Sequence, residues 1–343
     1  MVSRTHLTTT KEIQKRTGKT FHFATRLLPR RIRHGTYVLY AFFRVADEVV
    51  DDPDAAPPGE QRAELDRIEA AALGEAPTDD PVLEAFHEVK EEVGIPDEEV
   101  EAFVDAMRMD VDTDRYADHD ELSTYLRGSA VAVGHMMTAL MEPDDPEAAR
   151  PHATALGEAF QLTNFLRDVR EDVVDYDRIY VPRSVLAEHG VDERTVLDLE
   201  YTPEFGEAMR AELARTERRY HEGVQGIGYL PEDCQFAVLL SAVLYADHHH
   251  LVRELDYDVL SERRTLSTAR RLRLAARTWF HWKRTGDPVE TFYAAGAVEP
   301  PEDAETDLDP GVADDRSSAV PRPLRAAVGG AKRIAGSVLT GLR

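Results

Sequence analysis

Cysteine is nearly absent from the sequence, with Cys234 the single residue of its type. One cysteine excludes a framework of intramolecular disulfides. No catalytic pattern surrounds this cysteine, so we expect an inert thiol and a reducing compartment.

Long hydrophobic runs are also missing. No stretch of about 18 apolar residues occurs, so no membrane-spanning helix is expected. The first twenty residues, "MVSRTHLTTTKEIQKRTGKT", lack the apolar core of a signal peptide. We expect a cytoplasmic protein, with peripheral contact at the inner membrane face as an additional expectation.

Positive charge is scarce, and lysine above all. The formal net charge is −24, from 65 acids against 41 bases. The lysines are Lys11, Lys15, Lys19, Lys90, Lys283 and Lys332. An acidic surface of this kind repels nucleic acid, so no nucleic-acid partner is expected. The balance favours adaptation to a salt-rich cytoplasm, where ions screen self-repulsion; the alternative is an ordinary acidic protein.

Strand signals are scarce, whereas helical periodicity recurs between Pro- and Gly-containing breaks. The sequence therefore predicts an all-α domain over residues 1–292. From residue 293 the composition turns acidic and Pro-rich, which is typical of a disordered linker. The final stretch, "LRAAVGGAKRIAGSVLTGLR", carries no acid and is either a membrane-surface helix or a frayed tail.

A polar stripe interrupts the otherwise apolar segment from Thr36 to Asp51. Its members, Arg44, Asp47, Glu48 and Asp51, are spaced 0, 3, 4 and 7 and share one helix face. Such a stripe is either a solvated face, with Arg44 paired to its acidic neighbours, or the wall of a polar cavity. In the second case, Asp47 and Asp51 direct two carboxylates at one point.

A matching stripe lies in "QLTNFLRDVREDVVDYDRIYVP", residues 161–182. Gln161, Asn164, Asp168 and Asp172 share one helix face, and the amides suit a cavity wall better than a face washed by water. The alternative is a surface lattice of salt bridges. Two facing carboxylate pairs in a helical bundle would hold several Mg²⁺ ions, which neutralise a diphosphate leaving group.

Several stretches in this order resemble the squalene and phytoene synthase family of all-α prenyltransferases. They are "KTFHFATRLLPRRIRHGTYVLYAFFRVADEVVDD", "MRMDVDTDRY", "YLRGSAVAVGHMM", "QLTNFLRDVREDVVDYDRIYVP" and "YDVLSERRTLSTARRLRLA". Together they cover roughly residues 15–285, and the chain is most similar to the phytoene-forming branch. The resemblance implies an isoprenoid-synthase-like helical bundle around a central apolar cavity.

The resemblance also implies a reaction. Two molecules of geranylgeranyl diphosphate would condense head to head, through a cyclopropyl diphosphate, to phytoene for carotenoid biosynthesis. Mg²⁺, or Mn²⁺ in its place, would be required, and NADPH would not. The alternatives are squalene or dehydrosqualene synthesis from farnesyl diphosphate and, in another class, a non-catalytic acidic bundle. Oligomeric state and product geometry stay open.

By the resemblance, particular side chains receive roles. The metal ligands would be Asp47, Asp51, Asn164, Asp168 and Asp172, with Arg44 beside them at a diphosphate. The substrate-binding set would be Thr20, Tyr40, Arg44, Ser129, Val133, Gly134, Gln161, Asn164, Arg167, Arg178, Tyr180, Tyr245 and Arg264. The basic N-terminal run from Lys11 to Arg33 either attracts anionic diphosphates or membranes, or pairs with the acid-rich remainder.

Overall fold

The regular secondary structure of the described residues is entirely helical. The computed structural model describes residues 25–51, 56–296, 298 and 299. Apart from one parallel bridge between Arg115 and Ile179, no strand pairing occurs in these ranges. The predicted all-α class is therefore confirmed.

The α-helices are α3 Arg30–Asp51, α4 Pro58–Leu73, α5 Pro81–Val93, α6 Asp97–Met109, α7 His119–Leu126, α8 Val133–Met141, α9 Pro146–Tyr176, α10 Arg183–Glu188, α11 Glu193–Leu197, α12 Pro203–Gln225, α13 Glu232–Ala246, α14 His248–Glu254, α15 Thr268–Thr285 and α16 Pro288–Ala295. A π-helix, η1 Arg127–Ala132, joins α7 to α8, and a 3₁₀ turn, η2 Gly226–Tyr229, follows α12. The predicted domain end after residue 292 falls within α16.

Local sequence explains where the long helices begin and end. The carboxylate of Asp145 accepts a hydrogen bond from the Ala148 amide at 3.0 Å, which caps α9, and Pro146 occupies the first turn. After 31 residues α9 ends at Asp177, whose φ of 53° is left-handed. Helix α9 is thus long enough to run through the whole bundle.

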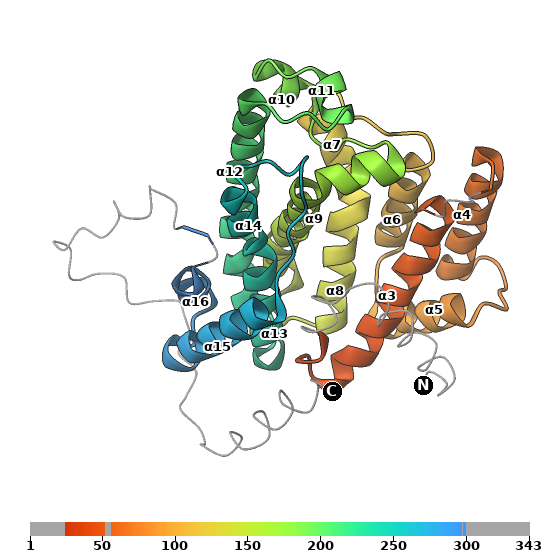
Figure 1. The fold of residues 1–343 in the computed structure, drawn as a ribbon. Coiled ribbons are helices and arrows are strands. Elements are labelled where there is room, and N and C mark those ends of the chain that lie inside the picture. Colours follow the sequence, from red (N-terminus) through yellow and green to blue (C-terminus); the bar gives the residue numbers. More distant parts are fainter. Residues whose placement is uncertain (1–24, 52–55, 297, 300–343) are drawn as a thin grey trace. The chain divides into compact units, whose positions relative to one another are not determined.

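Helix α9 lies at the centre of the fold. It packs along α12 on one side and against η1 and α8 on the other (Figure 1). Helices α4, α5 and α6 pack with α3 at one side of the bundle, while α13, α15 and α16 pack together at the other. None of the described helices is both long and apolar enough to cross a membrane.

Candidate active site

One face of α9 changes from apolar to charged along its length. Its N-terminal half contributes to the wall of a cavity of about 180 Å³. The residues of α9 that line it are Ala149, His152, Ala153, Leu156, Gly157, Phe160 and Gln161. The same face continues past Asn164 to Asp168 and Asp172, the latter about 16 Å beyond Gln161 at 1.5 Å per residue. An apolar chain in the cavity can therefore place a charged head at the aspartates.

The predicted small residues of the opposite wall lie on η1 and α8. Ser129, Val133 and Gly134 line this cavity together with Gln161. The hydroxyl of Ser129 is buried and has no hydrogen-bond partner among the described residues. An unsatisfied hydroxyl at a cavity wall is a donor available to a ligand.

The helices that enclose the cavity approach closely at two glycines. A Cβ on Gly134 would lie 2.9 Å from the carbonyl oxygen of Ala153, and a Cβ on Gly157 would lie 2.8 Å from that of Ala130. Both distances are shorter than ordinary contacts, so only glycine permits α8 and η1 to approach α9 this closely. The Gly/Ala-rich segment therefore serves helix packing as well as lining.

Asp168 is held by two arginines. Arg167 Nε donates to Asp168 Oδ1 at 2.7 Å, and Arg263 Nε lies 2.6 Å from the same oxygen. Arg263 also pairs with Glu171 at 2.5 Å. Burial is the largest influence on the pKa of Arg167 and alone would lower it, but the hydrogen bond with Asp168 and the surrounding negative charges together raise the pKa of Arg167.

Asp172 sits one turn further along α9, without such partners. Its carboxylate forms no hydrogen bond or ion pair with the side chains described, and its pKa is raised to about 8. Burial is the largest cause, and the negative charges of Asp168 and Glu171 add to it, against Arg178 and Arg167. A half-buried carboxyl with acidic neighbours is a site where a bound cation would relieve repulsion.

Arg178 and a group of stacked aromatic rings lie beside Asp172 at the C-terminal end of α9. Arg178 donates to the backbone oxygen of Asp110 at 2.7 Å and lies 3.4 Å from its carboxylate. Tyr125 donates its hydroxyl to the other oxygen of Asp110 at 2.9 Å. Tyr180 stacks on Phe165 with ring centroids 3.7 Å apart, and burial raises the pKa of Tyr180. Tyr180 thus serves packing beside the site.

Tyr245 connects α13 to the other predicted side chains. Its ring stacks on Phe160 at 4.7 Å, and burial raises its pKa. Arg167 lowers this pKa, while Tyr40 of α3 and Asp168 of α9 raise it further. The predicted residues Tyr40, Arg167 and Asp168 thus act electrostatically on Tyr245.

In the acidic stripe of α3, Arg44 pairs with its acidic neighbours, as expected if the stripe is a solvated face. Arg44 forms an ion pair with Asp47 and donates to Glu48 at 3.2 Å. Asp51 ends α3, and its side chain lies outside the described part, as do Thr20 and Asp52. Solvation and ligand binding therefore both remain interpretations of this stripe.

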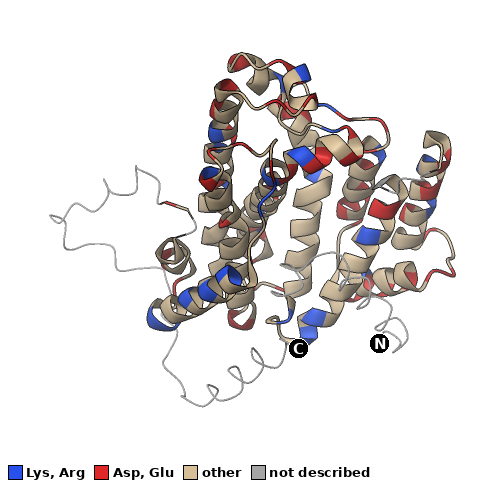
Figure 2. Ribbon diagram, in the orientation of Figure 1, with Lys and Arg blue, Asp and Glu red and all other residues tan. Residues whose placement is uncertain are grey.

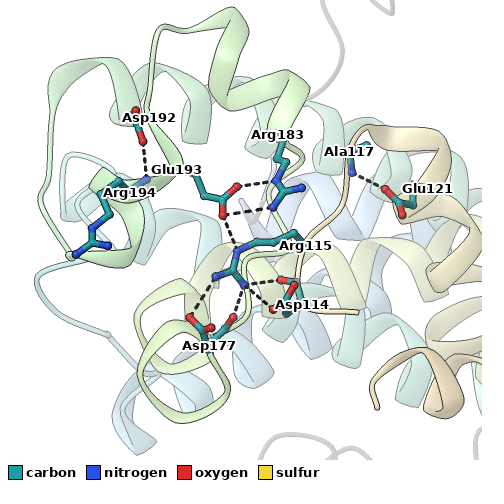
Figure 3. Close-up of polar contacts among 9 residues, drawn as sticks. All are labelled: Asp114, Arg115, Ala117, Glu121, Asp177, Arg183, Asp192, Glu193 and Arg194. Carbon is teal, nitrogen blue, oxygen red and sulfur yellow. Dashed lines mark hydrogen bonds and ion pairs between the residues drawn. The ribbon is translucent and has the colours of Figure 1, made fainter. Parts of the chain in front are cut away.

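A network centred on Arg115 fixes the end of α9 (Figure 3). Arg115 lies 3.1 Å from both Asp177 and Glu193, and it donates to the Asp114 backbone oxygen at 2.7 Å. Glu193 in turn accepts from Arg183 Nε at 2.6 Å. The loop after α6 and the segment after α9 are thereby joined, which limits motion of the turn that carries Asp172 and Arg178.

Comparison with known proteins agrees with this geometry. The family model described as squalene/phytoene synthase matches residues 14–271. The chain belongs to the squalene/phytoene synthase family. It is a prenyltransferase-type enzyme, and the predicted resemblance is confirmed.

Individual members of the squalene/phytoene synthase family are similar over most of the chain. The phytoene synthase of Rhodobacter capsulatus is 32% identical over 280 residues, covering 80% of this chain and 81% of the relative. The 15-cis-phytoene synthase of Synechococcus elongatus is 30% identical over 277 residues, covering 76% and 88%. A crystal structure of a dehydrosqualene synthase with ligand superposes with a TM-score of 0.74 at 26% identity, covering 82% of this chain and 98% of that one.

The acidic residues of this family member suit a divalent cation only in part. Asp168 and Asp172 supply oxygen donors one turn apart, and burial together with the charges of Asp168 and Glu171 raises the pKa of Asp172. Among described side chains, no group of three or more His, Cys, Asp or Glu residues is close enough to hold a metal. Asp47 of α3 is one of these described residues, so it does not form such a group with Asp168 and Asp172 in this structure. A complete site would need further oxygen donors.

Some residues of the site escaped sequence reasoning. Arg264 was the predicted contact, but it pairs with Glu262 at 2.7 Å, while its neighbour Arg263 reaches Asp168. Adjacent arginines in "SERRT" cannot be told apart without the loop conformation. Asp110 was also missed, although it lies in the quoted stretch "MRMDVDTDRY".

Proposed function

We propose that the chain is a phytoene synthase that joins two molecules of geranylgeranyl diphosphate head to head. Each C20 unit loses its diphosphate, and two protons leave as the C40 hydrocarbon forms. The intermediate would be a cyclopropylcarbinyl diphosphate. The names of the relatives that share about 30% of the sequence support the phytoene product.

The observation that carries this proposal is that one face of α9 lines the cavity as far as Gln161 and then presents the carboxylates of Asp168 and Asp172. A prenyl diphosphate has the same polarity, with an apolar chain and an anionic head. With its chain against Gly157 and Gln161, its head would lie toward Asp168 and Asp172. The apolar lining would also keep water from a carbocation.

The metal proposal follows from the donor set. Asp47, Asp51, Asp168, Asp172 and Asn164 would hold Mg²⁺, or Mn²⁺ in its place. When bound, the cations would neutralise the diphosphate and make it a better leaving group. Asp168 now pairs with Arg167 and Arg263, so ligation would release these guanidinium groups toward the phosphate oxygens.

Arginines supply the rest of the anion binding. Arg167, Arg178 and Arg263 lie around Asp168 and Asp172, and guanidinium forks match phosphate oxygens. Arg44 would add charge from α3. Ser129, with its unsatisfied hydroxyl, would contact the substrate within the cavity.

A second candidate is condensation of farnesyl diphosphate to dehydrosqualene. The observation behind it is the structural similarity to a dehydrosqualene synthase at 26% identity. The two reactions differ in the chain length that the cavity must accept, while the acidic end would act identically.

One experiment tests both candidates. The purified protein is incubated with Mg²⁺ and either C15 or C20 diphosphate, with and without NADPH, and products are identified by mass. Phytoene from the C20 substrate without NADPH supports the proposal. Exclusive conversion of the C15 substrate would replace it by the second candidate, and no product from either would contradict both.

A further inference from the structure

Helix α15 has a charge opposite to that of the chain as a whole. In a protein of net charge −24, residues Thr268–Thr285 contain no Asp or Glu. Their bases are Arg270, Arg271, Arg273, Arg277, Lys283 and Arg284. Figure 2 shows these bases in succession along the helix. A local excess of positive charge on so acidic a protein needs an explanation beyond solubility.

The outward face of α15 is also apolar. Leu272, Ala276, Trp279 and Phe280 are spaced 0, 4, 7 and 8, which places them on one side of the helix. The exposed fraction is 45% for Trp279 and 60% for Phe280. Large aromatic side chains that are adjacent and exposed mark an interaction surface rather than scattered apolar residues.

The inward face of α15 packs against the helical bundle through other residues. Leu274 and Thr278 are buried, and the Trp282 ring packs against Phe236 with centroids 6.4 Å apart. The helix therefore has its own contact with the bundle. The outer stripe, with Trp279 and Phe280, is not needed for that contact.

Several bases beside the outer stripe are available to a ligand. Arg270 is paired with Asp247 at 2.5 Å and with Glu254 at 2.8 Å. Arg273 and Arg277 are exposed and form no ion pair with a described residue. They line an open, polar depression of about 580 Å³, whose other charged or ionisable side chains are Arg253, His250, Arg270 and the two acids, Asp247 and Glu254, that Arg270 pairs.

We propose that α15 docks on an anionic lipid surface. Trp279 and Phe280 would insert between lipids, while Arg273, Arg277, Lys283 and Arg284 contact phosphate headgroups. Aromatic side chains flanked by bases on one helix face are typical of helices that lie in a membrane interface. The depression beside Arg273 and Arg277 would accept a headgroup.

Charge complementarity favours a lipid surface over a neutral partner. Each base near an anionic membrane contributes an attraction that falls off within a Debye length. The acid-free α15 would thus orient a protein of net charge −24 toward the lipid surface. A second copy of this acidic chain is the competing occupant, and the test separates the two.

The test measures co-sedimentation of the full chain with vesicles at about 0.1 M salt. Vesicles of phosphatidylcholine alone are compared with vesicles that also contain phosphatidylglycerol. We expect binding to the anionic vesicles and at least about tenfold weaker binding for Trp279→Ser/Phe280→Ser. Arg273→Gln/Arg277→Gln should also bind more weakly and lose preference for the anionic vesicles.

Tyr229→Ser is the matched control, because Tyr229 has the same 45% exposure as Trp279 and lies on η2. It should bind like the wild type, and circular dichroism would show that all variants are folded. Absence of wild-type binding, or unchanged binding of the aromatic variant, would overturn the proposal. So would a wild-type dimer in light scattering that Trp279→Ser/Phe280→Ser converts to monomer.

Discussion

Arg263 lies 2.6 Å from the carboxylate of Asp168, which joins the loop before α15 to the charged end of α9. Arg170 reinforces this link by donating to the Leu260 backbone oxygen at 2.5 Å. The loop thus carries a cation to the acidic stripe, and its sequence neighbour Arg264 points elsewhere.

The two arginines of this loop can be compared directly. We expect Arg263→Gln to lower kcat/KM by about tenfold or more, because an arginine beside Asp168 and the diphosphate is lost. Arg264→Gln should have a much smaller effect, since Arg264 pairs with Glu262. Steady-state kinetics of both variants show whether Arg263, as the structure indicates, or Arg264, as the sequence predicts, contributes to the site.

Asp172→Asn tests the acidic stripe. Turnover should fall at least about 100-fold, because an amide replaces a carboxylate donor, while the fold is retained. Asp47→Asn should behave in the same way. Asp175→Asn is the control on an exposed part of α9. Wild-type phytoene output from Asp172→Asn would remove Asp172 from the ligand set.

Chelation tests the metal requirement of turnover, and thermal melting tests metal binding independently of product formation. We expect EDTA to abolish turnover and added Mg²⁺ to restore it. Mg²⁺ should also raise the melting temperature of the wild type, because a ligand that binds only the folded state stabilises it. The same addition should leave the melting temperature of Asp172→Asn nearly unchanged. Full activity after chelation would contradict the metal proposal.

A buried ion network away from the site predicts the response to acid. Glu99 has 0% side-chain exposure and pairs with His135 at 2.8 Å, Arg127 at 2.7 Å and Arg150 at 2.8 Å. Burial alone would raise its pKa, but His135 and Arg127 lower the pKa of Glu99 below its ordinary 4.5. The stability from this group is therefore present above pH 4.5 and is lost as pH falls through the lowered value.

Glu99→Gln should accordingly lower the free energy of unfolding at pH 7 by about 3 kcal/mol, because it removes the buried carboxylate that Arg127, Arg150 and His135 share. It should also flatten the loss of stability below pH 4.5. Urea denaturation as a function of pH measures both effects. An unchanged acid profile would show that Glu99 is not the group responsible.

Gly134→Ala tests the close approach of α8 and α9. The added methyl would meet the Ala153 carbonyl at 2.9 Å, so we expect a loss of about 1–3 kcal/mol in thermal unfolding. Gly59→Ala in α4 is the control, since nothing lies within 4 Å of its Cβ position. That control should be neutral or slightly stabilising. Equal melting temperatures for the two variants would contradict this role of Gly134.

Sequence periodicity predicted the helices and the stripe of α9, because a stripe needs only the local 3.6-residue period. The resemblance had placed Ser129, Val133, Gly134 and Gln161 in the substrate-binding set, and the structure adds that all four line one cavity. Arg263 could not be chosen over Arg264, since a loop has no such period. Asp110 reaches Arg178 and Tyr125 only through tertiary contacts.

The one-sided lining of α9 has a consequence for selectivity. From Ala149 to Gln161 the lining covers twelve residue steps, which is roughly 18 Å of helix at 1.5 Å per residue. If the diphosphate is fixed beyond Gln161, each turn of α9 toward Ala149 marks a further depth for the hydrocarbon tail. The position of a bulky side chain along α9 would then limit how far the tail can extend. Side-chain size at Ala149 or Ala153 would set the longest prenyl chain that the cavity admits.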